Sequence, residues 1–238
     1  MEIIMEIIDI AASILSRAAR RVDISAQNLA NMTVPGYKAR KSFAGVLSLA
    51  EGANISAASE RQAATFIDFA PGKTENTGNP FDLAISGAGF FAVRSPDGQF
   101  YTRNGQFRRD GDGHLVTAAG LFLQSATGDL VVGSNAAILS DGTVLDDGEP
   151  VARVNIVDFA DPQSLQSVGP DVFAASAASS QEAADPQIRQ GMLEAANVSA
   201  ADEMVSIMAT LRSAESGQRI VQTYDDLMAR AITTFGQL

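Results

Sequence analysis

The sequence predicts an α+β protein: long N- and C-terminal helices form an antiparallel coiled-coil layer, with a central, mostly antiparallel β domain between them. Three observations support this fold class. The first thirty residues and the last forty both carry apolar residues at helical spacing, and the region between them alternates short strand patterns with Gly-rich turns. At 238 residues the chain is long enough to bury a core. The predicted parts are residues 1–41 (N-terminal helix and joint), 42–190 (β domain with connecting loops) and 191–238 (C-terminal helix).

The N-terminal helix is predicted from about Ile3 to Asn31. Apolar residues recur there at alternating spacings of four and three, which is the seam of a coiled coil, and the arginines lie off that seam. At ~1.5 Å per residue such a helix would be about 43 Å long. Its length suits assembly with other helices better than burial inside one compact domain. The seam residues on which we expect assembly to depend are Ile8, Leu15, Val22 and Leu29.

The stretch SAQNLANMTVPGYKAR, residues 25–40, is predicted to be the joint between helix and β domain. Asn28 and Asn31 are three residues apart and share a helix face, so their amides can cap exposed carbonyls or bond to a neighbouring subunit; both roles stay open. Pro35 forces the preceding residue into an extended conformation, and Gly36 permits a sharp exit. Tyr37 then leads the chain toward the β domain.

The C-terminal helix is predicted to begin at Ser199, which reads as an N-cap with Asp202 and Glu203 in the first turn. A second apolar stripe lies beside its seam, so the apolar face is broad and needs more than one neighbour. Copies of the same helices would cover it. The seam residues expected to drive assembly are Ile207, Leu211, Val221, Met228, Ile232 and Phe235.

The central region is predicted to be a set of hairpins, because dipeptides such as Asp97-Gly98 and Asn104-Gly105 separate its short apolar runs. The expected strands are 65–69, 81–85, 90–94, 100–103, 114–117, 121–124, 129–132 and 151–159.

The composition excludes several function classes. Cysteine is absent and histidine occurs once, at His114, which removes thiol nucleophiles and multi-histidine metal sites. The net charge of −11 argues against nucleic-acid binding. Nine acidic residues and only one base, Arg153, lie between Asp141 and Asp185, whereas bases cluster between Arg17 and Lys41 and hint at a surface with its own partner. No stretch approaches the ~18 apolar residues of a membrane span.

Two glycine motifs are interpreted as turns. Gly87-Ala-Gly-Phe-Phe-Ala92 fits G-x-G-x-x-A, but the residues after it alternate like a strand, whereas a dinucleotide site requires a helix. The Asp110-Gly-Asp-Gly sequence could open a calcium loop, yet its twelfth position is Leu121 and not Glu, so a hairpin turn is favoured. We therefore predict no catalytic, metal or cofactor-binding residues, no cofactor and no enzymatic activity.

Three stretches together resemble the flagellar axial proteins of bacteria, the rod and hook family. SAQNLANMTVPGYKAR resembles the family's N-terminal signature, FDLAISGAGFFAV with YTRNGQFRRDGDGHLVTAAG resembles its shared β region, and MLEAANVSAADEMVSIMATLRSAES resembles its C-terminal signature. The resemblance implies a structural, non-enzymatic subunit that self-assembles through its terminal helices into a helical tube that transmits torque. It also implies export through the flagellar type III apparatus without a cleaved signal peptide, which agrees with an acidic start, MEIIMEIIDI, that lacks the basic region of such a signal. Whether Met1 or Met5 is the start stays open.

Within the family the sequence resembles the proximal-rod FlgF type more than the distal-rod FlgG type, because the segment after Lys41 is short for a distal-rod subunit. The expected location is the periplasm-spanning rod of the basal body. The expected partners are copies of the chain, other rod proteins, the export apparatus and the surrounding periplasmic ring, with no nucleic acid and no direct membrane span. The alternatives are a distal-rod or hook-type subunit and, from other classes, a secreted β-domain hydrolase or a binding module.

Overall fold

The computed structural model describes residues 2–42, 65–175, 180–182 and 187–235 and divides the chain into two compact units. The helical unit comprises Met1–Ala30, Arg40–Thr65 and Ser199–Leu238, and the β unit comprises Asn31–Ala39 and Phe66–Val198. The chain therefore passes from one unit to the other more than once. The domain boundaries predicted after residues 41 and 190 stay predictions.

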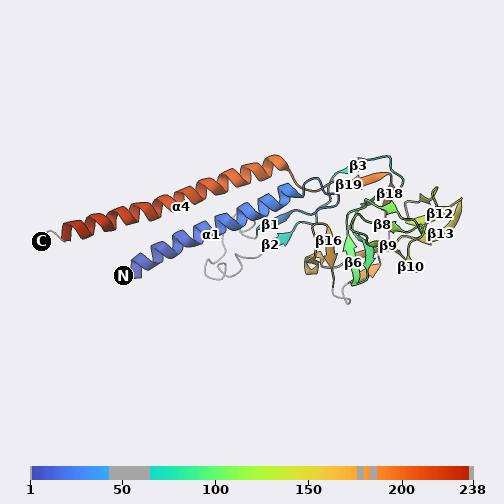
Figure 1. The fold of residues 1–238 in the computed structure, drawn as a ribbon, viewed down its shortest axis with the longest axis horizontal. Helices are drawn as coiled ribbons and strands as arrows, with labels where there is room; N and C mark the ends of the chain where they lie inside the picture. Colours follow the sequence, from blue (N-terminus) through green and yellow to red (C-terminus); the bar gives the residue numbers. More distant parts are fainter. Residues whose placement is uncertain (1, 43–64, 176–179, 183–186, 236–238) are drawn as a thin grey trace. The chain divides into compact units, whose positions relative to one another are not determined.

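The helical unit contains α1 (Glu2–Ala30) and α4 (Ala200–Phe235). Figure 1 shows the two helices side by side and antiparallel, with both chain ends at the same end of the pair. Ser199 caps α4, because its Oγ accepts the backbone N–H of Asp202 at 3.4 Å. Neither α1 nor α4 contains an apolar stretch of the length that a membrane span requires.

The predicted coiled-coil layer is wrong. The described chain has one N-terminal helix and one C-terminal helix, and these meet through small side chains instead of interlocking apolar seams. Ala11, Ala18 and Thr210 are buried, and a Cβ added at Gly217 would lie 3.2 Å from Cγ2 of Ile14. Close approach of the helices depends on this absence of bulk, and of the larger α4 seam residues Ile207 and Val221 are half-buried while Leu211 and Met228 are exposed.

The β unit is rich in short strands. Its largest sheet has the order β15-β16-β6-β5-β9-β8-β7, with β14 added beside β5 and β10 beside β9, and separate small sheets pair β11-β12-β13, β18 with β4, and β19 with β3. The pairings within the β unit are antiparallel. A short 3-10 helix, η2, covers Pro162–Ser164. The strands of the described residues are β1 (Arg40–Ser42), β2 (Thr65–Ile67), β3 (Thr74–Asn76), β4 (Leu83–Ser86), β5 (Phe90–Ser95), β6 (Gly98–Thr102), β7 (Arg108–Arg109), β8 (Leu115–Val116), β9 (Phe122–Ser125), β10 (Gly128–Asp129), β11 (Ala137–Ile138), β12 (Thr143–Asp146), β13 (Glu149–Arg153), β14 (Ile156–Phe159), β15 (Gln166–Ser167), β16 (Val172–Ala174), β17 (Ser180–Glu182), β18 (Gln187–Gln190) and β19 (Met192–Glu194).

Strand β5 organises the core of the β unit because both of its faces are buried. Phe91 and Val93 belong to one apolar cluster, whereas Phe90 and Ala92 belong to a second cluster on the opposite face. The first cluster also holds Leu83, Leu115, Leu123 and Val144, and the second holds Tyr101, Phe159 and Phe173. The continuous apolar run FFAV is thus a strand covered on both sides, which confirms that Gly87-Ala-Gly is followed by a strand and not by a dinucleotide-binding helix.

Candidate assembly site

The joint that follows α1 is held inside the β unit. Backbone hydrogen bonds from Val34 N to Asn31 O (3.0 Å) and from Tyr37 N to Val34 O (3.2 Å) turn the chain, and Gly36 N donates to Glu194 O at 2.7 Å. Gly36 has a φ of +69°, and a Cβ there would lie 2.3 Å from the backbone carbon of Arg103. Only glycine satisfies both conditions. The sharp turn at Pro35-Gly36 therefore packs directly against the backbone of Arg103.

A buried ionic cluster lies directly after this turn. Lys38 Nζ is 2.6 Å from Glu194 Oε1, and Arg103 Nη1 is 3.4 Å from Glu194 Oε2, with all three side chains almost inaccessible to solvent. Burial lowers the pKa of Lys38, and the neighbouring charge of Glu194 offsets this only in part. Backbone groups complete the cluster: Lys38 donates to Ala70 O at 2.9 Å, and Gly72 N donates to Glu194 Oε1 at 2.8 Å. The cluster fastens the joint to the segments around residues 70 and 194.

Asn197 reinforces the same connection. Its Oδ1 accepts the backbone N–H of Ala39 at 2.7 Å, and its Nδ2 donates to the carbonyls of Asp68 (2.8 Å) and Ala70 (3.0 Å). The chain thus enters and leaves the β unit through one set of hydrogen-bonded partners. Sequence reasoning did not single out Lys38, Arg103, Glu194 or Asn197 as a group, although all four lie within the family signatures quoted above.

In the helical unit, the side chain of Asn28 likewise connects chain segments through hydrogen bonds. Its side chain is buried, its Nδ2 donates to Arg40 O (2.8 Å) and to Glu203 Oε1 (2.7 Å), and its Oδ1 accepts the N–H of Arg40 at 2.8 Å. These contacts join the last turn of α1 to β1 and to the first turn of α4. Asn31, Pro35 and Val34 are half-buried, and Tyr37 is buried.

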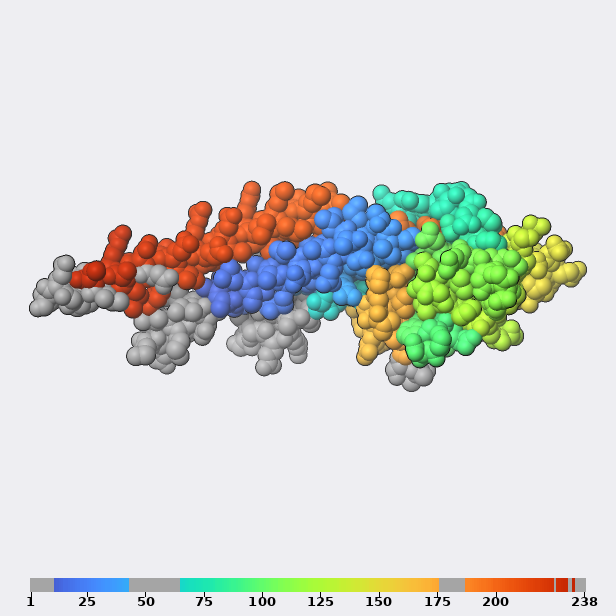
Figure 2. Space-filling model, in the orientation of Figure 1, coloured from blue at the N-terminus to red at the C-terminus, as the bar shows by residue number. Residues whose placement is uncertain are grey.

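The predicted seam residues do not share one environment. Leu15, Val22, Leu29, Ile207 and Val221 are half-buried, whereas Leu211 and Met228 are exposed, and the side chains of Ile8, Ile232 and Phe235 lie outside the described part of the chain. Leu211 shares one face of α4 with Met204 and Met208, at spacings of four and three, and all three are at least half exposed. We call Met204, Met208 and Leu211 the outer stripe. Figure 2 shows side chains of α4, in orange and red, standing out along the side away from α1.

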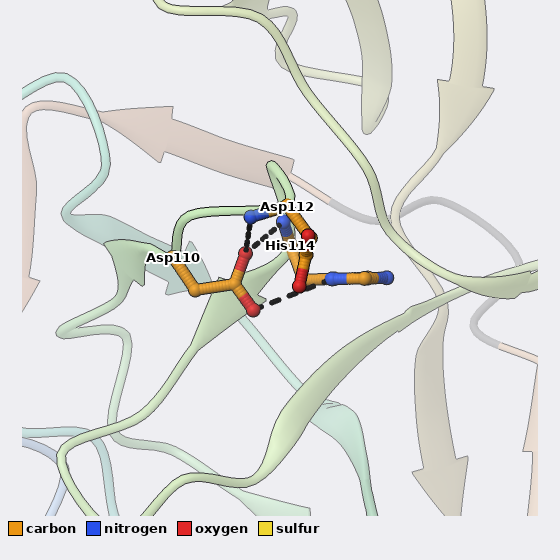
Figure 3. A group of neighbouring side chains, drawn as sticks. All are labelled: Asp110, Asp112 and His114. Carbon is orange, nitrogen blue, oxygen red and sulfur yellow. Dashed lines mark hydrogen bonds and ion pairs between the residues drawn. The ribbon is translucent and has the colours of Figure 1, made fainter.

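The Asp110–His114 segment offers three metal-ligating side chains, yet its contacts are those of a turn. In Figure 3 the carboxylate of Asp110 faces the other two residues. Its Oδ1 accepts the backbone N–H groups of Asp112 (3.0 Å) and His114 (2.8 Å), and its Oδ2 lies 3.3 Å from His114 Nδ1. Desolvation acts to raise the pKa of Asp110, but these N–H donors and the His114 ring outweigh it and lower the pKa. Because the segment joins the paired strands β7 and β8, the predicted hairpin turn is confirmed.

Three carboxylates of the described residues accept hydrogen bonds that shift their pKa. In the described part of the chain, those whose pKa clearly departs from the ordinary value, Asp110, Asp129 and Asp141, have it lowered. A general acid working near neutral pH needs the opposite shift. The interactions described at this site are contacts between chain segments, chiefly the Lys38–Glu194–Arg103 cluster and the hydrogen bonds of Asn197.

Comparison with known proteins identifies the class of this protein. Residues 8–38 match the family described as flagella basal body rod protein, residues 84–150 match the flagellar hook protein FlgE/F/G D1 domain, and residues 189–234 match the flagellar basal body rod FlgEFG protein C-terminal family. The chain is 30% identical to the rod protein FlgG of Borreliella burgdorferi, over 93% of this chain and 95% of that protein. It is 28% identical to FlgF of Caulobacter vibrioides, over 92% and 93% of the two chains, and 31% identical to FlgF of Escherichia coli, over 91% and 92%.

These matches cover both helical ends and the β region. They define an axial structural protein of the bacterial flagellum, one that assembles with other rod proteins in the basal body. The chain belongs to the flagellar basal-body rod protein family and is a structural subunit of the rod.

Proposed function

We propose that this chain is a proximal-rod subunit of the FlgF type and that it binds neighbouring subunits through the outer stripe of α4. The observation that carries the assembly role is the exposure of Met204, Met208 and Leu211 on one helix face. Burying the exposed part of each such side chain is worth on the order of 1 kcal/mol. A partner surface would therefore gain several kcal/mol from this stripe, while a solitary chain leaves it in water.

The proximal assignment is supported by alignment length. The alignment with B. burgdorferi FlgG spans 253 positions and that with C. vibrioides FlgF spans 228, a difference of 25, although they cover 93% and 92% of this chain. The FlgG relative therefore contains insertions that this chain lacks. The distal-rod type is the alternative, because relatives of both names match with similar identity.

Family membership also supports export through the flagellar type III apparatus, a place in the periplasm-spanning rod, and neighbours that include copies of the chain, other rod proteins and the surrounding periplasmic ring. The joint residues Asn28, Asn31, Pro35, Gly36 and Tyr37 would then fix the passage between the two units in each subunit. The half-buried seam residues Leu15, Val22, Leu29, Ile207 and Val221 would support the helices on which the outer stripe is displayed.

The test replaces the chain's own gene with the variant Leu211→Asp. A carboxylate in the middle of the outer stripe is expected to abolish motility and to remove the chain from purified basal bodies. The matched control is Val168→Asp, which places the same charge at an exposed apolar position of the β unit and should leave motility intact. Normal basal bodies in the Leu211→Asp strain would refute the role of the stripe. Imaging a tag at the hook-proximal end of the rod would refute the proximal assignment.

A further inference from the structure

Three arginines of α1 form an unpaired basic surface in the helical unit. Arg17, Arg20 and Arg21 are exposed, and within the described part of the chain none of them makes an ion pair or hydrogen bond. They line a groove of about 240 Å³ together with Ser42 of β1 and with Thr210 and Ser213 of α4. The groove therefore combines three guanidinium groups with hydroxyl groups from two other elements.

This arrangement costs stability unless an anion occupies it. Arg17 and Arg21 are four residues apart on one helix face, and like charges at that spacing destabilise a helix by ~0.2–0.5 kcal/mol. Guanidinium groups bind carboxylates through two parallel hydrogen bonds, and the hydroxyls of Ser42 and Ser213 can donate further ones. The chemistry of the groove therefore fits a partner that presents several carboxylates close together.

The β unit presents such a group at the turn between β12 and β13. Asp147 and Gly148 both have positive φ, +50° and +89°, and Asp146 pairs with Glu149, so the two strands are joined by a two-residue turn. Asp147 and Glu149 are exposed, and Asp146 is half-buried. No lysine or arginine occurs between Ala137 and Glu149. The turn is thus a short acidic tip without a base among its sequence neighbours.

We propose that the arginine groove of one copy binds the β12–β13 turn of a second copy in the rod. This inference rests on the proposed function, because it requires copies of the chain to be neighbours. The chain carries a net charge of −11, so copies repel one another unless a basic surface meets an acidic one at their contact. Because the groove and the turn are different surfaces, the contact is heterologous and does not close on itself, which is what a helical assembly requires.

The absence of native cysteine gives a clean test by disulfide trapping. Chains carrying Arg20→Cys and chains carrying Asp147→Cys are co-expressed, basal bodies are purified after mild oxidation, and cross-linked dimers are measured on non-reducing gels. Dimers are expected only when both variants are present. The matched control pairs Arg20→Cys with Asp97→Cys, since Asp97 is another exposed acid in a β-hairpin turn of the same unit, and should give at least tenfold less dimer.

The results separate this inference from the proposed function. If both variants reach the basal body but no dimer forms, the contact is refuted while the rod assignment stands. If the unmodified, tagged chain is missing from basal bodies, the proposed function itself fails, and this inference fails with it. Cross-linking of Arg20→Cys to a cysteine placed in a different rod protein, without any dimer of this chain, overturns the assignment of a second copy as the occupant.

A charge exchange covers the case in which single variants do not assemble. Arg20→Glu with Arg21→Glu is expected to reduce motility at least tenfold, and so is Asp147→Arg with Glu149→Arg. The chain that carries all four changes should recover motility, because each carboxylate again faces a guanidinium. Failure of the fourfold variant to recover, with its protein level unchanged, contradicts the proposed contact.

Discussion

Lys38 and Glu194 are 156 residues apart in the sequence and form an ion pair of 2.6 Å between Nζ and Oε1 in the interior of the β unit. Arg103 shares the same carboxylate, so one acidic side chain compensates two buried cations. Removing one member of a buried ionic group costs much more than the group contributes in total, because the remaining charge stays desolvated.

The first prediction therefore concerns Glu194→Gln. This variant leaves Lys38 and Arg103 without a countercharge and is expected to lower the free energy of unfolding by about 3–5 kcal/mol, measured by urea denaturation. The control Glu149→Gln removes an exposed carboxylate of the same kind and should change stability by less than about 0.5 kcal/mol. A loss below about 1 kcal/mol for Glu194→Gln would show that the cluster is not the anchor described above.

The second prediction separates backbone conformation from steric contact at Gly36. Gly36 and Gly78 have nearly equal φ values, +69° and +71°, but a Cβ at Gly36 would lie 2.3 Å from Arg103 C, while nothing lies within 4 Å of one at Gly78. Gly78→Ala should cost about 1–2 kcal/mol from the left-handed conformation alone. Gly36→Ala should cost at least about 2 kcal/mol more, because the backbone of Arg103 must move. Equal losses of thermal stability in the two variants would argue against this contact.

The third prediction concerns Asn28→Asp. The change replaces the Nδ2 donor with an oxygen, which breaks the hydrogen bond to Glu203 and places two carboxylates together at the start of α4. We expect a loss of about 1–3 kcal/mol in the helical unit and faster tryptic cleavage after Arg212 and Arg219. Gln27→Ala is the control, since Gln27 is an exposed neighbour of Asn28 in the same helix turn and does not contact Glu203 in the way that Asn28 does. Unchanged cleavage rates in Asn28→Asp would contradict the bracing role of Asn28.

The fourth prediction is a pH dependence. Hydrogen bonds from Arg94 and then from Gln124 lower the pKa of Asp129 below its ordinary value of 3.8. Since the folded-state pKa is the lower one, the unfolded chain binds more protons in acid, and the stabilising contribution is lost as the pH falls through the folded pKa. The melting temperature should therefore fall steadily below about pH 4. Asp129→Asn should make this fall shallower, and an identical slope in the variant would exclude Asp129 as a contributor.

The sequence predicted best where a local pattern matched a buried surface. The FFAV run and the Asp-Gly turns placed β5, β6 and the β7–β8 hairpin within a few residues, because apolar runs and turn residues act locally. The hairpin turn predicted at Asn104-Gly105 is wrong, since β6 and β7 on its two sides are not neighbours in the sheet. Gly105 instead lies against the backbone of Leu83, where a Cβ would be 1.6 Å from the carbonyl oxygen. The predicted strand 151–159 is in fact two strands, β13 and β14, separated by Val154-Asn155. The sequence did not predict this break because no turn dipeptide occurs there.

Long-range partners could not be predicted. From the sequence, Lys38 was one of several bases in a cluster expected at the surface. Only the folded structure shows its ion pair with Glu194. The strands β3 and β19 lack strong strand patterns of their own and form because the two segments pair with each other. The coiled-coil layer was expected because Leu211 and Met228 continue an apolar seam. The spacing of apolar residues does not determine which helix, if any, packs against that seam. Small residues, Ala18 and Gly217 among them, decided how the two helices meet.

The pairing of Lys38 with Glu194 also sets the order in which the molecule can fold. A chain made from its N-terminus exposes Lys38 long before Glu194 and Asn197 exist, and joining segments so distant in the sequence costs more loop-closure entropy than forming a hairpin. The hairpins between residues 83 and 153 can form early, but the joint stays open until the last fifth of the chain arrives. The protein thus completes its interior only when synthesis is nearly finished, and until then it remains an incompletely closed chain.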